Sequence, residues 1–286
     1  MTYKTKFIAE IGSNHNKDLK RCYKLIDEAK KLGFYAVKFQ LFKINKLFSK
    51  DAKKLFKNVN KIKKRELPEK FIPKLYNYCK KKKIKFGCTP FDIKAVKILQ
   101  KYVDFFKIAS YEINWKDILE ACAKTNKPII LSTGMATFEE VQRAFNTLKK
   151  FNNNVSLLHC VSAYPANPTS CNLQSIKFLK KKFKCPVGWS DHTVNSLIIL
   201  NAIKYQNAEI IELHFDLDGF GWEEKEGNHH CWLPRDLQKM MNYIYNEKQI
   251  EGKLKKNFAK EEIIERRFRA DPSDGLRPIK IYREKL

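Results

Sequence analysis

Two histidines, His192 and His214, stand at or near the ends of two short apolar runs, residues 187–192 and 210–215. If these runs are neighbouring parallel strands, their ends lie roughly 5 Å apart. Imidazoles at that separation can share one divalent metal ion or one substrate oxygen. Because two ligands alone hold a metal weakly, water, a carboxylate or the substrate must complete the coordination. The pair therefore predicts a shared metal ion or a shared substrate oxygen.

Two lysines, Lys38 and Lys107, lie inside apolar runs. An unpaired ammonium group in such surroundings costs free energy. A single strand lysine is equally well explained by a position at the edge of a sheet. Two of them with hydroxyl groups nearby favour binding of an anion such as phosphate or carboxylate.

Further polar side chains follow the apolar runs, where they would surround the same site. The residues of this group are Glu10, Gln40, Ser110, Glu112, Ser132 and Ser190. For Glu10 the simplest alternative is a cap for the following loop. Tyr164 precedes Pro165 and is most simply part of a rigid loop, although a tyrosine there can also stack on a sugar.

Eight short apolar runs, each closing on polar residues, are the elements that must position these groups. They cover residues 7–12, 36–40, 85–90, 105–110, 128–133, 155–160, 187–192 and 210–215. The gaps leave room for helices, and residues 19–31, 93–102 and 138–151 carry apolar side chains at helical intervals. Strand alternating with helix predicts a (β/α)8 TIM barrel, whose active sites lie at the carboxyl ends of the strands. A doubly wound sheet is the alternative, but no G-x-G-x-x-G follows the first run.

Composition sets limits on the class of protein. Of 286 residues 43% are hydrophobic, which is enough for a sizeable core. No apolar run approaches the ~20 residues that cross a bilayer, so no membrane partner is expected. The eight cysteines include no C-x-x-C pair and are expected to be reduced thiols. A cytoplasmic enzyme is the expectation.

The formal net charge of +26 raises the alternative of a nucleic-acid partner. However, the lysines are spread over nearly all helix-like segments, and no known nucleic-acid-binding motif accompanies them. A lysine-rich solvated surface is the favoured interpretation, and nucleic acid is not an expected partner. The positive field would still attract an anionic substrate.

Several of these segments together resemble the sialic acid synthase family. The matching motifs follow the family's order and cover about residues 7 to 215. They are residues 8–15, 36–40, 88–91, 106–110 with Glu112, 127–135, 158–160 with 164–165, 190–193 and 212–215.

The resemblance implies a manganese-dependent condensation of phosphoenolpyruvate with an N-acylated amino sugar, N-acetylmannosamine or a related hexosamine. The products would be a nonulosonic acid and phosphate. By the same resemblance His192 and His214 hold Mn2+ or another divalent metal, and Glu10 lies near the reacting carbons. The remaining matches divide into phosphoenolpyruvate contacts (Lys38, Lys107, Ser110, Ser132, Ser190) and sugar-side contacts (Gln40, Glu112, Tyr164). A homodimer is the assembly considered.

Three features depart from the family pattern. The usual C-terminal antifreeze-like domain is expected to be missing, so residues 1–286 would form a single TIM-barrel domain in which 216–286 are a loop, a helix and a basic tail. The segment 227–232 adds His229 and His230 near the mouth. Their simplest role is to cap a loop, and the alternatives are a third metal ligand or a sugar contact. Ser162 stands where asparagine is common, which affects the predicted sugar side of the site.

Two other functions remain open at this point. Another aldolase or synthase on the same barrel could act on a different aldehyde acceptor, because fold alone does not fix chemistry. In that case Lys38 or Lys107 could form a Schiff base. A non-catalytic basic binding protein is the other alternative, and it has no need for two histidines at one mouth.

Overall fold

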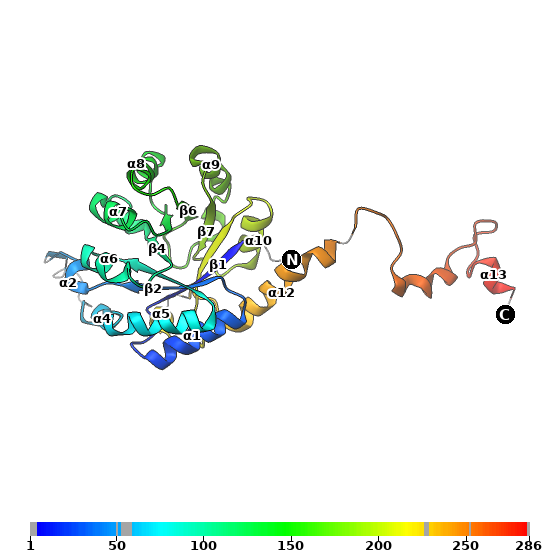
Figure 1. Cartoon of the computed structure of the whole chain (residues 1–286). Coiled ribbons are helices and arrows are strands. Elements are labelled where there is room, and N and C mark those ends of the chain that lie inside the picture. The colour runs from blue at the N-terminus through cyan, green and yellow to red at the C-terminus, as the bar shows by residue number, and fades with distance from the viewer. Residues whose placement is uncertain (1–4, 50, 53–58, 226–228, 252, 285–286) are drawn as a thin grey trace. The chain divides into compact units, whose positions relative to one another are not determined.

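The computed structural model describes residues 5–49, 51–52, 59–225, 229–251 and 253–284. Contacts between residues divide the chain into two compact units, residues 1–245 and residues 246–286. The first unit contains the strands and the helices packed around them (Figure 1).

Eight parallel strands pair in chain order and close into a barrel, because β1 pairs with both β2 and β8. This confirms the predicted (β/α)8 TIM barrel. All eight predicted strands are present, although the fourth ends at Ile108 and its predicted end, residues 109–110, leads into a 3-10 turn. The strands are β1 Lys6–Gly12, β2 Ala36–Leu41, β3 Lys85–Pro90, β4 Phe105–Ile108, β5 Ile129–Ser132, β6 Val155–Cys160, β7 Val187–Asp191 and β8 Ile210–His214.

Helices follow the strands and cover the outside of the barrel (Figure 1). Capping residues start several of them: Asp18 accepts a hydrogen bond from Lys20 at the start of α1, and Thr137 forms a capping box with Glu140 at the start of α8. The α-helices of the first unit are α1 Leu19–Lys31, α2 Ile44–Leu47, α4 Val59–Lys63, α5 Ile72–Lys82, α6 Ile93–Leu99, α7 Lys116–Ala123, α8 Phe138–Lys149, α9 Gln174–Phe183, α10 Ser196–Lys204 and α11 Trp222–Lys225, with α12 Pro234–Glu251 reaching into the second unit. Short 3-10 turns are η1 Glu69–Phe71, η2 Ser110–Glu112 and η3 Pro168–Ser170.

The strands carry two different sets of buried side chains on their two faces. Outward-facing residues such as Phe39, Phe86 and Phe106 join the large core between strands and helices. A smaller apolar cluster lies apart from it, and alternation along the strands assigns it to the inside of the barrel. Its members are Ile8, Ala36, Phe105, Ile130, Leu158 and Ile210.

On most of the same strands, the residue two positions after the member of the inner cluster is polar. Ile8 is followed by Glu10, Ala36 by Lys38. Successive side chains alternate between faces, so residues two apart point to the same side. The barrel interior is therefore apolar toward the amino ends of the strands and polar at their carboxyl ends.

The second unit, residues 246–286, contains η4 Lys260–Ile263, η5 Glu265–Phe268 and α13 Lys280–Arg283. Local contacts order it: the Arg266 guanidinium lies 4.0 Å from the centre of the Phe258 ring, and Arg283 pairs with Asp274 at 2.6 Å. Most of its described residues are exposed to solvent.

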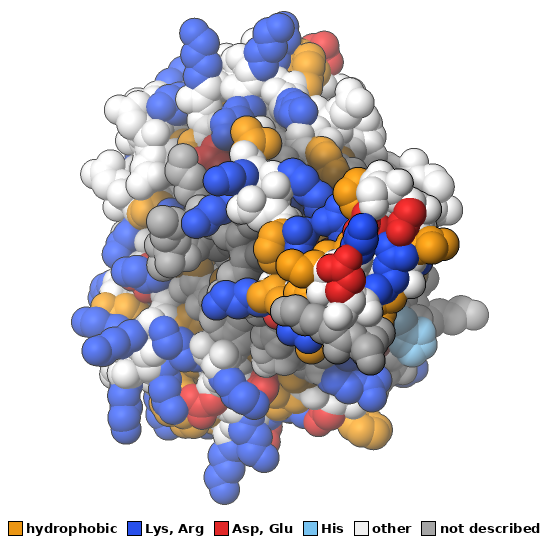
Figure 2. Space-filling view, turned by 90° about the vertical axis from the view of Figure 1, so that its right-hand side faces the viewer, with side chains coloured by type: hydrophobic (Ala, Val, Ile, Leu, Met, Phe, Trp, Pro, Cys, Tyr) orange, Lys and Arg blue, Asp and Glu red, His pale blue; other side chains and the backbone are white. Residues whose placement is uncertain are grey.

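The surface carries the basic residues that give the sequence its charge. Figure 2 shows lysine and arginine side chains spread over the visible face among other residue types. Among the described helices, none combines the length and apolar character that a membrane crossing requires.

Gly188 provides a test of barrel closure. A Cβ at this position would lie 2.0 Å from the Ile210 carbonyl oxygen of β8, and a main-chain atom cannot move without disturbing the strand pairing. We expect Gly188→Ala to lower the free energy of unfolding by about 3 kcal/mol or more, at the upper end for an overpacked site. Urea denaturation measures this change.

The control is Gly219→Ala. At Gly219 φ is +74° and an added Cβ meets none of the described atoms within 4 Å, so only the left-handed backbone is penalised. That costs about 1 kcal/mol. An equal decrease in the free energy of unfolding in the two variants would contradict the steric explanation for Gly188.

Candidate functional site

The structure places the predicted site residues at the carboxyl ends of the strands or in the loops that follow them. Most are buried, while Gln40, Ser162 and Tyr164 are partly exposed. The buried group consists of Glu10, Lys38, Lys107, Ser110, Glu112, Ser132, Ser190, His192 and His214.

A network of buried charges occupies the centre of this mouth. The Lys38 Nζ atom lies 2.7 Å from Glu10 Oε2 and 3.6 Å from Glu212 Oε1. The Lys107 Nζ atom lies 3.5 Å from the same Glu212 oxygen, and the Ser190 hydroxyl donates a hydrogen bond to it at 3.1 Å. Two ammonium groups therefore share one carboxylate, and a second carboxylate pairs with Lys38.

Strand register brings these groups together. Glu10 of β1 is in register with Lys38 of β2 on one side and with His214 of β8 on the other. Ser190 of β7 is in register with Glu212 of β8. The local sequence thus needs only an inward-facing polar residue at the end of each strand, and closure of the barrel supplies the contacts.

The network shifts the pKa values of its carboxyl groups in opposite directions. Burial raises the pKa of Glu10; Lys38 opposes this rise and Glu212 adds to it. Burial would also raise the pKa of Glu212, but the charges of Lys107 and Lys38 outweigh it and lower the value to about 2. Glu212 is the carboxylate that carries the balancing charge, and Glu10 is the one that more readily holds a proton.

The pKa values of the two lysines are also shifted in opposite directions. Burial lowers the pKa of Lys107 despite the opposing charge of Glu212. For Lys38 burial also acts downward, but Glu10 and Glu212 together raise its pKa. An anion bound beside Lys107 would supply the additional negative charge that this ammonium lacks.

His192 and His214 lie side by side with ring centres 5.3 Å apart, close to the separation expected from the sequence. The Nδ1 atom of His192 donates to the Val161 carbonyl oxygen at 2.6 Å, and Nδ1 of His214 lies 2.8 Å from Glu223 Oε2. Burial first and then the neighbouring His214 lower the pKa of His192 to about 3, so that ring is neutral. With Nδ1 held in both rings, Nε2 is the atom that remains to ligate a metal.

This arrangement fits a divalent ion bound by both rings. A metal lies roughly 2 Å from an imidazole nitrogen, and ring centres 5.3 Å apart leave room for one ion between them. A hydrogen bond from the second ring nitrogen to a carbonyl or carboxylate is the usual support for such a ligand. His192 and His214 both have it.

Glu223 reaches His214 because two glycines leave space. A Cβ at Gly12 would lie 1.8 Å from Glu223 Oε1, and one at Gly221 would lie 2.2 Å from Asn14 Oδ1. The Ser13 amide donates to Glu223 Oε1 at 3.0 Å, and the Glu223 amide donates to Asn14 Oδ1 at 3.0 Å. The loop after β1 and the loop after β8 therefore hold this carboxylate from both sides.

The Glu223 carboxylate is charged. Burial alone would raise its pKa, but the charge of His214 and the hydrogen bond to that ring, with His230 adding to them, lower it to about 2. In turn Glu223 outweighs the effect of burial on His214 and raises the pKa of that ring.

The remaining predicted residues form the rim of the mouth. Gln40 donates to Glu10 Oε1 at 2.7 Å, and the Tyr164 ring lies 4.2 Å from that of His192. Burial raises the pKa of Glu112 to about 7, although Lys107 acts against it. A side chain capable of exchanging a proton near neutral pH is therefore present on this rim.

Two of the predicted serines converge on Gly134. The Gly134 amide donates to Ser110 Oγ at 3.0 Å, and a Cβ on Gly134 would lie 2.3 Å from Ser162 Oγ. Ser132 ends β5 two residues earlier and is buried. Hydroxyl groups and an amide thus line the side of the mouth near β5.

Sequence reasoning placed Glu212 at the mouth without giving it a role, and it missed Glu223 and Cys231. Glu212 had a signal, since it precedes His214 by two positions on the same face of β8. Of the two histidines in segment 227–232, His230 is buried with its ring 4.5 Å from that of His214, whereas His229 is exposed and contacts Glu224. Gly227 and Asn228 of that segment lie outside the described residues.

Comparison with known proteins places the chain in a family. The sequence matches the NeuB family over residues 25–256. The chain belongs to this family. Within it, the N,N'-diacetyllegionaminic acid synthase of Campylobacter jejuni is 42% identical over 229 residues, which are 75% of this chain and 68% of that protein.

Two further similarities agree with this membership. The N-acetylneuraminate-9-phosphate synthase of Drosophila melanogaster is 33% identical over 84% of this chain and 67% of that protein. A crystal structure of N-acetylneuraminic acid (sialic acid) synthetase from Leptospira borgpetersenii, in complex with citrate, superposes with a TM-score of 0.79. It is 34% identical and covers 91% of this chain and 90% of that one.

Glu212→Gln tests the importance of the charge network for stability. The substitution leaves Lys107 and Lys38 without a shared carboxylate, and breaking a buried ion pair costs about 3–5 kcal/mol. Because Glu212 has a pKa of about 2 in the folded protein against an ordinary 4.5, its stabilisation is present above pH 4.5 and is lost as the pH falls through 2. The difference in unfolding free energy between wild type and variant should shrink over that window.

Glu120→Gln is the matched control. Glu120 pairs with Lys124 on the exposed surface of α7, at 3.0 Å, and its replacement should change the unfolding free energy little. A Glu212→Gln variant as stable as this control, or one whose deficit does not change with pH, would contradict the assignment.

Proposed function

We propose that this protein is a nonulosonic acid synthase. It condenses phosphoenolpyruvate with the open-chain aldehyde of an N-acylated amino sugar and releases phosphate. The family membership supports the class of enzyme, because the named relatives are synthases of sialic and legionaminic acids. The observation that carries the proposal is the pair His192 and His214, each with Nδ1 held and the rings 5.3 Å apart, beside two buried lysines.

The histidine pair would hold a divalent ion, for which Mn2+ is the candidate. When bound, such an ion supplies Lewis-acid polarisation of a carbonyl oxygen. The chain's own contribution is to fix the two rings, through the Val161 carbonyl group and the Glu223 carboxylate, before substrate arrives. Preorganisation of this kind avoids the cost of reorienting ligands during the reaction.

The lysines and hydroxyl groups suit phosphoenolpyruvate, which carries a phosphate and a carboxylate. Burial lowers the pKa of Lys107 even though Glu212 acts against it, and a bound anion would favour the charged ammonium group. Ser110 accepts the Gly134 amide hydrogen at 3.0 Å on the neighbouring side of the mouth, and its own hydroxyl group is a further donor. Ser132 and Ser190 complete the proposed set.

The sugar would lie toward the rim. Tyr164 packs its ring against His192, and aromatic rings commonly contact the apolar faces of sugars. Gln40 and Glu112 offer an amide and a carboxyl group to sugar hydroxyls. Ser162, where the family commonly has asparagine, would change this set of polar contacts.

Glu10 is the proposed proton-transferring carboxyl group. In the reaction the enol carbon of phosphoenolpyruvate attacks the aldehyde carbon, and positive charge develops on the carbon that bears the phosphate. Water adds there, and collapse of the adduct expels phosphate. A carboxylate near that carbon stabilises the charge and accepts the proton of the attacking water. Burial raises the pKa of Glu10, which suits a group that exchanges protons.

Glu10→Gln tests this role. The amide keeps the size and the hydrogen bond to Gln40 but cannot accept a proton, so kcat should fall by about 100-fold or more while phosphoenolpyruvate binds with similar affinity. Initial rates and calorimetric titration measure the two quantities. Glu28→Gln, on the exposed side of α1, is the control. A Glu10→Gln variant with wild-type kcat would contradict a catalytic role for Glu10.

The function itself is tested by phosphate release. Phosphoenolpyruvate with Mn2+ should release phosphate only when an accepted N-acylated hexosamine is added, and a chelator should abolish the release. His192→Ala and His214→Ala should each lose the activity because one ring cannot hold the ion. Release that does not depend on sugar, or that persists with chelator, would contradict the proposal.

A further inference from the structure

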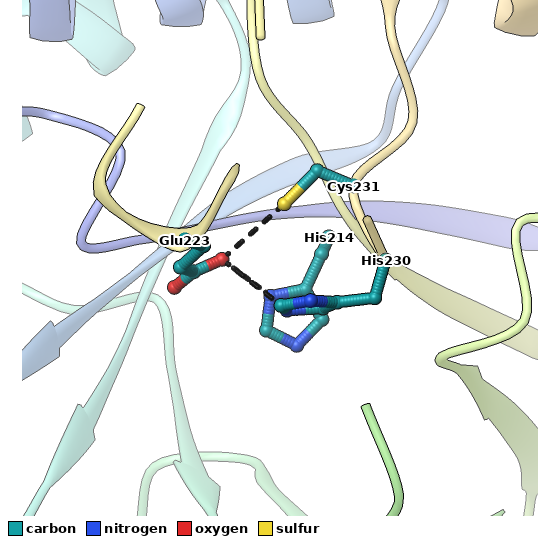
Figure 3. A group of neighbouring side chains, drawn as sticks. All are labelled: His214, Glu223, His230 and Cys231. Atoms are coloured by element: carbon teal, nitrogen blue, oxygen red, sulfur yellow. Dashed lines mark hydrogen bonds and ion pairs between the residues drawn. The ribbon is translucent and has the colours of Figure 1, made fainter. Parts of the chain in front are cut away.

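A second group of metal-binding side chains lies directly beside the histidine pair. It consists of His214, Glu223, His230 and Cys231, and one donor atom from each lies within 4.8 Å of the others (Figure 3). We propose that these four residues bind a soft divalent cation such as Zn2+, at a second site that shares His214 with the one formed by His192 and His214. The proposed synthase reaction assigns no role to His230 or Cys231, and it uses Glu223 only to orient the His214 ring.

The distances suit a four-coordinate ion. Glu223 Oε2 lies at the centre of the group, 2.8 Å from His214 Nδ1, 3.5 Å from Cys231 Sγ and 3.7 Å from His230 Nε2. Neighbouring ligand atoms around a tetrahedral zinc ion are about 3.3–3.8 Å apart, given bond lengths of about 2.0–2.3 Å. Small side-chain rotations therefore suffice to close the group around an ion.

The donor types favour zinc over manganese. Thiolate sulfur and imidazole nitrogen select zinc and similar ions, whereas manganese prefers oxygen ligands. The first site offers imidazole nitrogens and room for substrate oxygens, but this second group adds the sulfur of Cys231. The two sites share His214 through its opposite ring nitrogens, Nε2 for the first and Nδ1 for the second.

Main-chain contacts hold two of the ligand segments together. Trp232 forms a parallel bridge with Phe215, and its amide donates to the His214 carbonyl oxygen at 2.8 Å. The Cys231 amide donates to Glu224 Oε1 at 2.9 Å. His230 and Cys231 are consequently fixed beside the end of β8 and are buried, with 3% and 7% of their surfaces exposed.

The third segment is held by the loop after β1. Glu223 accepts a hydrogen bond from the Ser13 amide, and Asn14 Nδ2 lies 3.3 Å from Cys231 Sγ and 3.5 Å from Glu223 Oε2. The four ligands thus come from three chain segments that other contacts already position. A site assembled in this way does not need to be ordered by the ion.

Binding at the second site would oppose binding at the first. Zinc would displace the protons of the Cys231 thiol and of His214 Nδ1 into solvent and would take the Glu223 carboxylate that otherwise holds His214. The binding part of this proposal depends on the four donors alone; the expected inhibition of the enzyme rests on the proposed function. The two parts can therefore fail separately.

Cobalt titration tests the site directly. The full chain is stripped of metal with a chelator, dialysed and titrated with Co2+ while its absorption is recorded. Coordination of Cys231 should produce a thiolate-to-cobalt charge-transfer band in the near ultraviolet, and added Zn2+ should remove it. Cys231→Ser should lose the band and bind Zn2+ at least about tenfold more weakly, because loss of a direct ligand should cost no less than loss of an outer-shell partner.

Cys185→Ser is the matched control. Cys185 is a partly buried thiol just before β7, at the amino end of that strand, so the band should remain. Circular dichroism during thermal unfolding checks that both variants fold. Bound cobalt without a charge-transfer band in wild type, or an undiminished band in Cys231→Ser, would overturn the proposal.

The effect on activity is measured separately. Each protein is compared with its own manganese-supported rate of phosphate release, and Zn2+ should inhibit wild type and Cys185→Ser more strongly than Cys231→Ser. Equal inhibition of all three would overturn the competition between the sites. If no protein releases phosphate, the proposed synthase function fails while the cobalt spectra still decide whether the second site exists.

Discussion

Everything at the mouth of this barrel depends on the mutual neutralisation of buried charges. Lys38, Lys107, Glu10 and Glu212 are each at least about 96% buried, and any one of them alone would be strongly destabilising. Their pairing allows a polar layer to lie directly on the apolar inner cluster of the barrel. Within this network Lys107 shares its one carboxylate contact, to Glu212, with Lys38.

This neutralisation is possible only in a closed sheet. Lys107 belongs to β4 and Glu212 to β8, and these strands are four places apart around the barrel. In an open sheet four strand spacings amount to roughly 19 Å, whereas the observed contact is 3.5 Å. Closure brings the two side chains together across the interior. The charged groups of the site therefore meet only because the barrel closes.

Contacts between the loops after β1 and β8 fix the orientation of His214. Arg21 donates to the Asn14 carbonyl oxygen and pairs with both Asp216 and Asp218, so that α1, the first loop and the last loop are held together. Glu223 approaches through the space left by Gly12 and positions His214. The orientation of this ring is consequently set by residues some 200 positions away in the chain.

Much of the fold could be predicted from the sequence, and so could the part of the candidate site that lies on the strands. Apolar runs that end on polar residues locate the strands, and the parallel-strand spacing accounts for the nearness of His192 and His214. The spacing of Glu212 and His214 on one strand face was also visible. By contrast, the length of β4 was overestimated because the apolar run continues through Ala109 into a turn.

Loop contacts could not be predicted because nothing local encodes them. Glu223 is 9 residues from His214 in the chain but contacts it only because Asn14 and Ser13, more than 200 residues away, hold it in place. Likewise, Cys231 in the sequence is one of eight scattered thiols, and it becomes distinctive only when the Phe215–Trp232 bridge sets it beside β8. Periodicity reports which face a residue occupies, not which distant loop will meet it.

The central position of Glu223 couples the neighbouring polar side chains to one another. Its Oε2 atom contacts His214 and lies within 3.7 Å of both His230 and Cys231, so a change in any one of these residues alters the environment of the others. A carboxylate in this position must have either histidine or metal partners, because an unpaired buried charge is costly. These residues therefore constrain one another: Glu223 needs the space left by Gly12, and the orientation of His214 needs Glu223. Under the proposal of a second metal site, the choice of ion at this mouth would depend on Glu223, His230 and Cys231 as well as on the two strand histidines.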